Sequence, residues 1–256
     1  MNQTDLAALA IRYRRDGFVL VHDLVGKDTL DAVRERTRAI ACGEVPSYPD
    51  DDIELEPGAP RTRSIATVRK LNRCIENDAV LAEVARRPEI IAVVTAVLGP
   101  DIKVYGSQCF MKPPGGVEKP YHQDSAYFPI HPMELVTCWL ALDDVTVQNG
   151  AMHVIPGSHC HGLIDHGQEW MVGDRRDKRV PEALVPEARE TAICMPAGSC
   201  SFHHSLLLHR SLPNQTERSR RGFAVHYMSA RSKWVDPVQP CPVFPLVHGR
   251  AYDSCV

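Results

Sequence analysis

Apolar residues recur at helical spacing near the start of the chain, over residues 4–15 and 28–41. This spacing predicts two amphipathic helices, because positions three and four residues apart share one face of a helix. Asp28 stands at the start of the second segment and is expected to cap that helix. Between the two helices, the apolar run at residues 17–21 predicts a short strand.

Two further segments complete the part of the chain before residue 100. Residues 44–60 are polar and contain four prolines, so they predict a long surface loop. Loops of this length often act as lids. Residues 77–98 predict a second helical block, which Pro88 divides because proline disrupts the interior of a helix. We therefore expect residues 1–100 to be mostly helical.

After residue 100 the pattern changes to short runs rich in β-forming residues, separated by turn sequences that contain Pro, Gly and Asn. Many short strands with such turns predict an antiparallel sandwich or barrel. We expect residues 101–230 to form this core within a single domain that spans residues 1–256. The expected strands are residues 102–111, 135–142, 151–155, 191–194, 199–208 and 222–228.

Composition narrows the class of protein. A chain of 256 residues with 44% hydrophobic and 24% charged residues has the balance of an ordinary soluble domain. Its formal charge of −3 argues against a nucleic-acid partner, which usually needs an excess of Lys and Arg. The longest apolar run, residues 90–98, is too short to span a membrane. Nine cysteines without a CxxC pair, and no apolar leader in residues 1–25, favour a reducing compartment, so we expect a cytoplasmic protein.

A histidine and a carboxylate stand two positions apart at His122 and Asp124. In an extended segment both side chains project from the same face, which lets them supply two adjacent ligands to one metal ion. A third ligand must come from elsewhere, and the candidates are the three histidines in residues 203–209. We favour His209 because of its spacing from Arg220. Two histidines and one carboxylate that leave the opposite positions open are the ligand set of non-haem iron(II) oxygenases.

This ligand set indicates an oxo-acid co-substrate. Three open positions let iron(II) hold a bidentate oxo-acid and then dioxygen, whereas zinc needs only one open position. The far carboxylate of an oxo-acid needs a cation, and Arg220 can supply a bidentate salt bridge from the strand after His209. Ser211 can donate its hydroxyl to the same carboxylate. Two alternatives stay open, namely a non-redox metalloenzyme such as a zinc hydrolase, and a binding module without catalysis.

Several motifs occur in an order and at a spacing typical of a known family. They are Met-Lys-Pro-Pro at residues 111–114, Tyr-His-Gln-Asp at 121–124, Asn-Gly at 149–150, Ile-Pro-Gly-Ser-His at 155–159, Leu-His-Arg-Ser-Leu-Pro-Asn at 208–214, and Arg220. With these motifs the chain resembles the phytanoyl-CoA dioxygenase family of Fe(II)- and 2-oxoglutarate-dependent oxygenases. The resemblance implies a mainly β fold with flanking α-helices around a double-stranded β-helix, or jelly roll.

The resemblance also implies roles for individual residues. The metal ligands would be His122, Asp124 and His209. The residues in contact with 2-oxoglutarate would be Arg220, Ser211, Gln108, Trp139 and Lys70. For Lys70, which lies outside the stretch that carries the motifs, a solvated position on a loop is the alternative.

Asp124 bears on the type of reaction. Halogenating relatives of the family lack this carboxylate, so its presence implies hydroxylation or a related oxidation such as desaturation or ring closure. Fe(II) and O2 would act with 2-oxoglutarate, which is decarboxylated to succinate. The chain is shorter than the peroxisomal acyl-CoA enzymes, so we expect a small metabolite as substrate, bound by a monomer or homodimer. We expect the substrate contacts in residues 46–67, at Tyr127 and in the polar insert 161–190.

Overall fold

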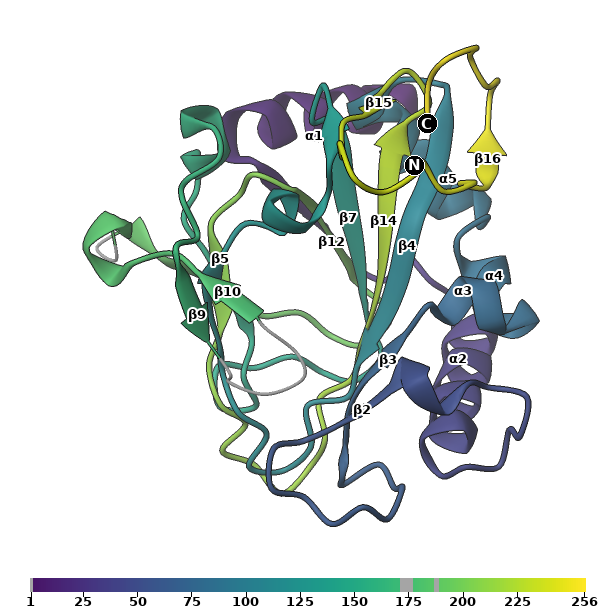
Figure 1. The fold of residues 1–256 in the computed structure, drawn as a ribbon, viewed down its shortest axis with the longest axis vertical. Helices are drawn as coiled ribbons and strands as arrows, with labels where there is room; N and C mark the ends of the chain where they lie inside the picture. Colours follow the sequence, from purple (N-terminus) through teal and green to yellow (C-terminus); the bar gives the residue numbers. More distant parts are fainter. Residues whose placement is uncertain (1, 171–176, 187–188) are drawn as a thin grey trace.

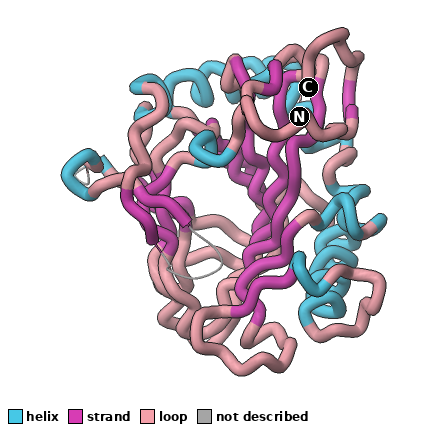
Figure 2. Tube along the Cα trace, in the orientation of Figure 1, coloured by secondary structure: helices cyan, strands magenta, loops and turns pink. Residues whose placement is uncertain are grey.

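The structure of the protein is a computed structural model that describes residues 2–170, 177–186 and 189–256. Two antiparallel sheets form its centre (Figures 1 and 2). The strands of the larger sheet are β1 (Phe18–Val21), β2 (Ile53–Leu55), β3 (Val68–Asn72), β4 (Ile102–Phe110), β7 (Leu135–Ala141), β12 (Cys200–His204), β14 (Gly222–Ser229) and β16 (Leu246–His248). The strands of the smaller sheet are β5 (Lys119–His122), β8 (Met152–Val154), β11 (Thr191–Ile193) and β13 (His209–Ser211).

Strand order shows how distant segments meet. Within the described residues, the larger sheet runs β1-β12-β7-β14-β4-β3-β2, with β16 also paired to β4. The smaller sheet runs β11-β8-β13-β5. Two short pairs accompany them, formed by β9 (Gln168–Trp170) with β10 (Asp177–Arg179) and by β6 (Ile130–His131) with β15 (Lys233–Trp234). This is the mainly β, jelly-roll fold that the family resemblance implies.

Helices cover the outer face of the larger sheet (Figure 1). They are α1 (Gln3–Asp16), α2 (Lys27–Ala41), α3 (Cys74–Asn77), α4 (Ala79–Val84) and α5 (Pro88–Leu98). Side chains alternate along a strand, so β14 serves two environments. Phe223, Val225 and Tyr227 pack in the core beneath the helices. Ala224 and His226 face the opposite side, where the two sheets enclose a cavity.

The helices and the first strand were predicted well, but the cap of α2 was not. The predicted helices at residues 4–15 and 28–41 and the strand at 17–21 are confirmed, and Pro88 starts α5, so it divides the second helical block as expected. The prediction that Asp28 caps α2 is wrong. The N-cap residue is Gly26, which has no side chain to accept a bond, and Asp28 lies in the first helical turn.

The stretch predicted as a loop, residues 44–60, contains regular structure. A single turn of 3-10 helix, η1 (Asp50–Asp52), leads directly into β2. The strand is only three residues long, and it forms because Ile53 is buried and pairs with Leu71 of β3. A local sequence pattern does not show which strand a segment will pair with, so it could not predict β2.

The strand predicted at residues 199–208 ends early, at His204. A turn then leads into β13, which begins at His209 in the other sheet. The apolar residues Leu207 and Leu208 are buried, but in two different clusters on either side of the turn. Burial without regular alternation therefore produced a pattern that resembles a continuous strand.

The sheets extend beyond the expected core at residues 101–230. Strands β1, β2 and β3 precede this range and β16 follows it, and all four belong to the larger sheet. All nine cysteines are free thiols. Every helix in the described part of the chain is too short or too polar to cross a lipid bilayer.

Candidate active site

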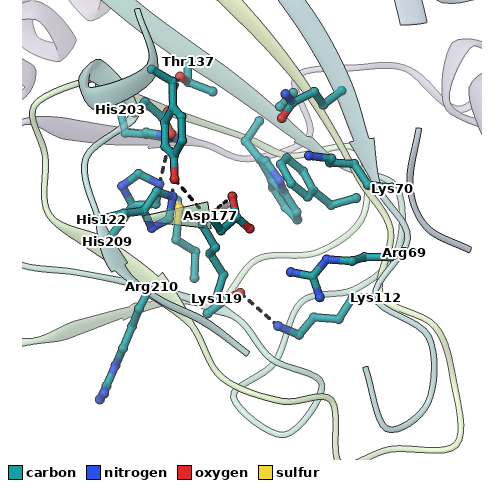
Figure 3. A pocket seen from close by; sticks show the side chains of 18 of the residues that line it. Arg69, Lys70, Lys112, Lys119, His122, Thr137, Asp177, His203, His209 and Arg210 are labelled. Carbon is teal, nitrogen blue, oxygen red and sulfur yellow. Dashed lines mark hydrogen bonds and ion pairs between the residues drawn. The ribbon is translucent and has the colours of Figure 1, made fainter. Parts of the chain in front are cut away.

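A cavity of about 250 Å³ lies between the two sheets (Figure 3). Both sheets contribute side chains to its lining. The cavity brings together every site residue predicted from the sequence, namely His122, Asp124, His209, Arg220, Ser211, Gln108, Trp139 and Lys70.

The three predicted metal ligands converge at one point of the cavity. His122 and His209 are directly opposite each other on the adjacent strands β5 and β13, and their ring centroids are 4.1 Å apart. Asp124 follows at the start of η2 (Asp124–Tyr127), where the extended residue Gln123 places it beside His122. Its Oδ1 lies 3.8 Å from Nε2 of His122 and 3.5 Å from Nε2 of His209. The three ligand atoms all lie within 4.8 Å of one another.

Backbone carbonyls orient both imidazoles. Nδ1 of His122 lies 2.8 Å from the carbonyl oxygen of Pro120, and Nδ1 of His209 lies 2.9 Å from that of Leu207. A carbonyl only accepts hydrogen bonds, so each Nδ1 carries the proton and each Nε2 presents a lone pair to the shared space. Burial lowers the pKa of both histidines, that of His209 to about 4. Neutral imidazole is the form that binds a metal ion.

The other oxygen of Asp124 is held by a polar row on the larger sheet. His203, Thr137 and His226 are opposite one another on the adjacent strands β12, β7 and β14. The hydroxyl of Thr137 donates to Oδ2 of Asp124 at 2.9 Å, and Nε2 of His203 lies 3.5 Å from the same oxygen. Such contacts behind a metal ligand fix its orientation. They leave Oδ1 directed at the two imidazoles.

A second part of the cavity is cationic. Arg220 is buried, its guanidinium lies over the ring of Trp139 at 5.2 Å, and its Nη2 donates to the carbonyl of Gly150 at 2.7 Å. Its Nε has no hydrogen-bond partner in the described part of the chain. Nζ of Lys112 lies 2.9 Å from Oγ of Ser211. Burial, and then the charge of Arg220, lower the pKa of Lys112 to about 6.

The guanidinium of Arg220 and the amine of Lys112, which can take up a proton, form a suitable site for an anion. Among the residues that the structure describes, no carboxylate forms an ion pair with Lys112 or Arg220. Burying positive charge without a partner is unfavourable, so an anionic ligand would stabilise this end of the cavity. The dicarboxylate 2-oxoglutarate has the required charge.

Two glycines make room for this arrangement. A Cβ atom on Gly222 would lie 1.7 Å from Cζ2 of Trp139, so the ring can lie across the sheet only because this position lacks a side chain. A Cβ on Gly150 would lie 2.6 Å from Cε of Lys112, and its φ of +84° also favours glycine. Both positions therefore shape the cationic end.

Lys70 and Gln108 reach the cavity from the edge of the larger sheet. Gln108 on β4 is opposite Ala224 of β14 and Asn72 of β3. Lys70 is on β3 and its Nζ lies 2.8 Å from Oε1 of Glu54. Burial lowers the pKa of this amine to about 8. The alternative of a solvated lysine on a loop is therefore wrong.

The remaining charged groups of the cavity form ion pairs. They are Arg69 with Glu56 at 3.4 Å, Lys119 with Asp177 at 2.8 Å, and Arg210 with Glu190 at 2.6 Å. Tyr127, expected to contact the substrate, lines the cavity. The expected segments 46–67 and 161–190 contribute Glu56 and Asp177, respectively, while residues 171–176 and 187–188 of the second segment lie outside the described residues.

Four residues of the site received no role from the sequence. Lys112 belongs to a motif that had been recognised, but a lysine beside two prolines is usually solvated. His203 is one of three candidates for the third ligand in the sequence, and the histidines not chosen were expected in the core or behind the ligands. Thr137 and His226 are polar residues within apolar strands, and this interruption of the pattern was the available signal.

Comparison with known proteins agrees with this geometry. The family model described as phytanoyl-CoA dioxygenase (PhyH) matches residues 13–222. The chain is 27% identical over 234 residues to the peroxisomal phytanoyl-CoA dioxygenase of Rattus norvegicus, which covers 87% of this chain and 68% of the relative. It is 26% identical over 249 residues to the L-proline trans-4-hydroxylase of Streptomyces griseoviridis, covering 90% and 89% of the two chains.

A solved structure shows the same fold. The epimerase SnoN, in complex with Fe3+, alpha ketoglutarate and nogalamycin RO, is 23% identical with a TM-score of 0.75, covering 96% of this chain and 100% of that chain. The trio of His122, Asp124 and His209 fits iron, since two neutral imidazoles and a carboxylate converge while the rest of the metal position faces the cavity. The chain belongs to the phytanoyl-CoA dioxygenase family of iron- and 2-oxoglutarate-dependent oxygenases.

Proposed function

We propose that this protein is a hydroxylase that oxidises an unactivated C–H bond of a small-molecule metabolite, with Fe(II), 2-oxoglutarate and O2. One observation carries the proposal. Two neutral imidazoles and a carboxylate, from His122, His209 and Asp124, share one cavity with the buried side chains of Arg220 and Lys112. This combination suits a metal ion and a dicarboxylate bound side by side.

In this proposal the metal ligands and the cationic end have different roles. His122, Asp124 and His209 would hold iron(II) by one face and leave its other positions to ligands. Iron(II) with bound 2-oxoglutarate supplies the oxygen chemistry, in which 2-oxoglutarate and O2 give succinate and CO2 and one oxygen atom is transferred to the substrate. The protein binds, orients and excludes water around these reactants.

The cationic end would bind the distal carboxylate of 2-oxoglutarate. Arg220 offers a planar guanidinium whose Nε is without a partner among the described residues. Lys112 would add a second positive charge once the bound dicarboxylate raises the pKa of its amine and the amine takes up a proton. Ser211 accepts a hydrogen bond from Lys112, which leaves its own hydroxyl proton free to be donated to the carboxylate. The ring of Trp139 would hold the guanidinium of Arg220 in place through a cation–π contact.

The alternatives fit the cavity less well. A zinc hydrolase needs one open position for water and has no use for a buried arginine and lysine placed to bind a carboxylate. A binding module without catalysis would not require three neutral or anionic ligand groups held by fixed hydrogen bonds. Hydroxylation is also the reaction that the name of the proline-hydroxylating relative states for that protein. We propose the same reaction type here.

The test is anaerobic calorimetry of 2-oxoglutarate with and without Mn(II) as a redox-inert substitute for iron, followed by assay of succinate release with Fe(II) and O2. We expect metal-dependent binding, which His122→Ala and Asp124→Ala abolish. The matched control is His161→Ala, an exposed histidine outside the cavity. Binding of 2-oxoglutarate that is equally strong in Asp124→Ala would contradict the proposal.

The oligomeric state, the partners and the location of the protein are part of the same proposal. We propose a cytoplasmic monomer or homodimer with a small-molecule substrate and no nucleic-acid or membrane partner. Light scattering after size-exclusion chromatography would measure the oligomeric state. A nucleic-acid shift at physiological salt would contradict the absence of a nucleic-acid partner.

A further inference from the structure

His226 is a buried histidine of the cavity whose Nδ1 contacts Thr137 in the polar row behind Asp124, while neither the metal site nor the cationic end uses its Nε2. It lies on β14, two positions beyond Ala224 and four beyond Gly222, and all three point to the cavity side of the sheet. At roughly 3.3 Å per residue, this places it about 13 Å along the strand from Gly222. Gly222 underlies Trp139, which in turn lies beneath Arg220. His226 is therefore far from the end that suits the distal carboxylate.

The hydrogen bonds around Thr137 fix the tautomer of His226. Oγ1 of Thr137 lies 2.9 Å from Oδ2 of Asp124 and 2.9 Å from Nδ1 of His226. The single hydroxyl proton must point to the carboxylate, because a carboxylate can only accept. Oγ1 then accepts, so Nδ1 of His226 must be the donor. In the neutral ring this leaves Nε2 as a hydrogen-bond acceptor.

This acceptor has no partner among the residues that the structure describes. Nε2 of His226 is buried, and no donor in the described part of the chain lies within hydrogen-bond distance. A buried acceptor without a partner is unfavourable, so the site favours a ligand that brings a donor. The ring of Phe128 lies 5.0 Å from that of His226, and both side chains line the cavity. A suitable ligand therefore combines a donor with an apolar surface.

The other reactants cannot supply this donor. Ionised 2-oxoglutarate carries only acceptor oxygens, and dioxygen has no hydrogen atom. The donor must come from the substrate or from water. We infer that His226 is a substrate-binding residue whose Nε2 accepts a hydrogen bond from a hydroxyl or N–H group of the substrate, beside an apolar part that packs on Phe128. This inference rests on the proposed function, and it narrows the substrate class to small molecules that carry such a donor.

The first test is 15N NMR of the full chain, labelled at histidine and loaded with Zn(II) and 2-oxoglutarate. We expect a protonated Nδ1 and an unprotonated Nε2 for His226. The probes are cyclohexanol and cyclohexylammonium, with methoxycyclohexane as the matched compound that has no donor. Either donor probe should shift the Nε2 resonance, and methoxycyclohexane should not. A protonated Nε2, or a resonance that responds to neither donor probe, would overturn the inference.

The second test measures selectivity. We expect the native chain to bind cyclohexanol about tenfold more tightly than methoxycyclohexane, as one buried hydrogen bond allows. In His226→Phe this ratio should fall toward one, whereas the exposed-site control His161→Phe should keep it. An unchanged ratio in His226→Phe contradicts the inference. Calorimetry of 2-oxoglutarate on the same preparations distinguishes failure of this inference from failure of the proposed function. If the native chain does not bind 2-oxoglutarate, the proposed function itself is wrong.

Discussion

Nζ of Lys112 lies 2.9 Å from Oγ of Ser211, inside a cavity where Arg220 is also buried. The lysine reaches this position from the segment that follows β4, and the serine from β13 of the opposite sheet. The contact joins the two sheets at the cationic end. It also places an amine with a lowered pKa where the distal carboxylate of 2-oxoglutarate would bind.

The first prediction concerns protons. The pKa of Lys112 is lowered to about 6 by burial and by Arg220, so at pH 8 the amine is mostly neutral. A bound dicarboxylate favours the ammonium form and raises this pKa. Binding of 2-oxoglutarate at pH 8 should therefore take up a proton, and affinity should fall as pH rises above about 6, by at most about tenfold per pH unit.

Calorimetry in two buffers with different ionisation enthalpies measures this uptake. Lys112→Met keeps much of the length and removes the titrating group. We expect proton uptake to disappear in that variant. Uptake that persists unchanged would assign the proton to another group.

The second prediction concerns the shape of the cation at Arg220. Arg220→Lys keeps a positive charge but loses the planar guanidinium that can bind a carboxylate through two nitrogen atoms. We expect the KM for 2-oxoglutarate to rise about 10- to 100-fold, with metal affinity unchanged. The control is Arg218→Lys at an exposed position nearby. Equal KM values in the two variants would argue against a carboxylate at Arg220.

The third prediction concerns the support of Asp124. Thr137→Val removes the hydroxyl that donates to Oδ2, while Thr137→Ser retains it. Loss of such a contact behind a ligand typically weakens metal binding 10- to 100-fold, and we expect about that loss for Mn(II) in Thr137→Val. Thr137→Ser should bind nearly as the native chain does. If both variants lose affinity equally, packing of the Thr methyl group rather than the hydrogen bond is the cause.

The fourth prediction concerns Gly222. An alanine there would place Cβ 1.7 Å from Trp139, so the indole ring must move. We expect a loss of about 1–3 kcal/mol in the free energy of unfolding, as for other overpacked interiors, together with weaker 2-oxoglutarate binding. Chemical denaturation measures the first effect. Gly26→Ala, at a position with open space and φ of −65°, should leave 2-oxoglutarate binding unchanged, and any loss of stability there should be only that of an N-cap glycine replaced by alanine.

The sequence predicted elements best where periodicity is local. The amphipathic spacing of α1 and α2 was sufficient, because each helix presents one apolar face to the core. Strand β2 was missed because it depends on a partner, β3, and not on its own three residues. The turn between β12 and β13 was missed because Leu207 and Leu208 are buried as fully as strand residues would be.

The metal trio was predictable, and the groups behind it were not. His122 and Asp124 stand two positions apart, and a family motif supports them, so their proximity follows from the sequence. The contact between Thr137 and Asp124 depends on how β7 lies against η2, which no local pattern reports. Lys112 was missed because a lysine without an ion-pair partner is ordinarily exposed, and its burial follows only from the folded structure.

The alternation of side chains along β14 has a consequence for how this protein can diversify. Phe223, Val225 and Tyr227 pack beneath the helical layer, while Ala224 and His226 line the cavity. Packing beneath the helices and the lining of the cavity thus depend on alternate positions of the same eight-residue strand. A substitution at His226 would therefore change the lining of the cavity while the side chains that pack beneath the helices stay the same.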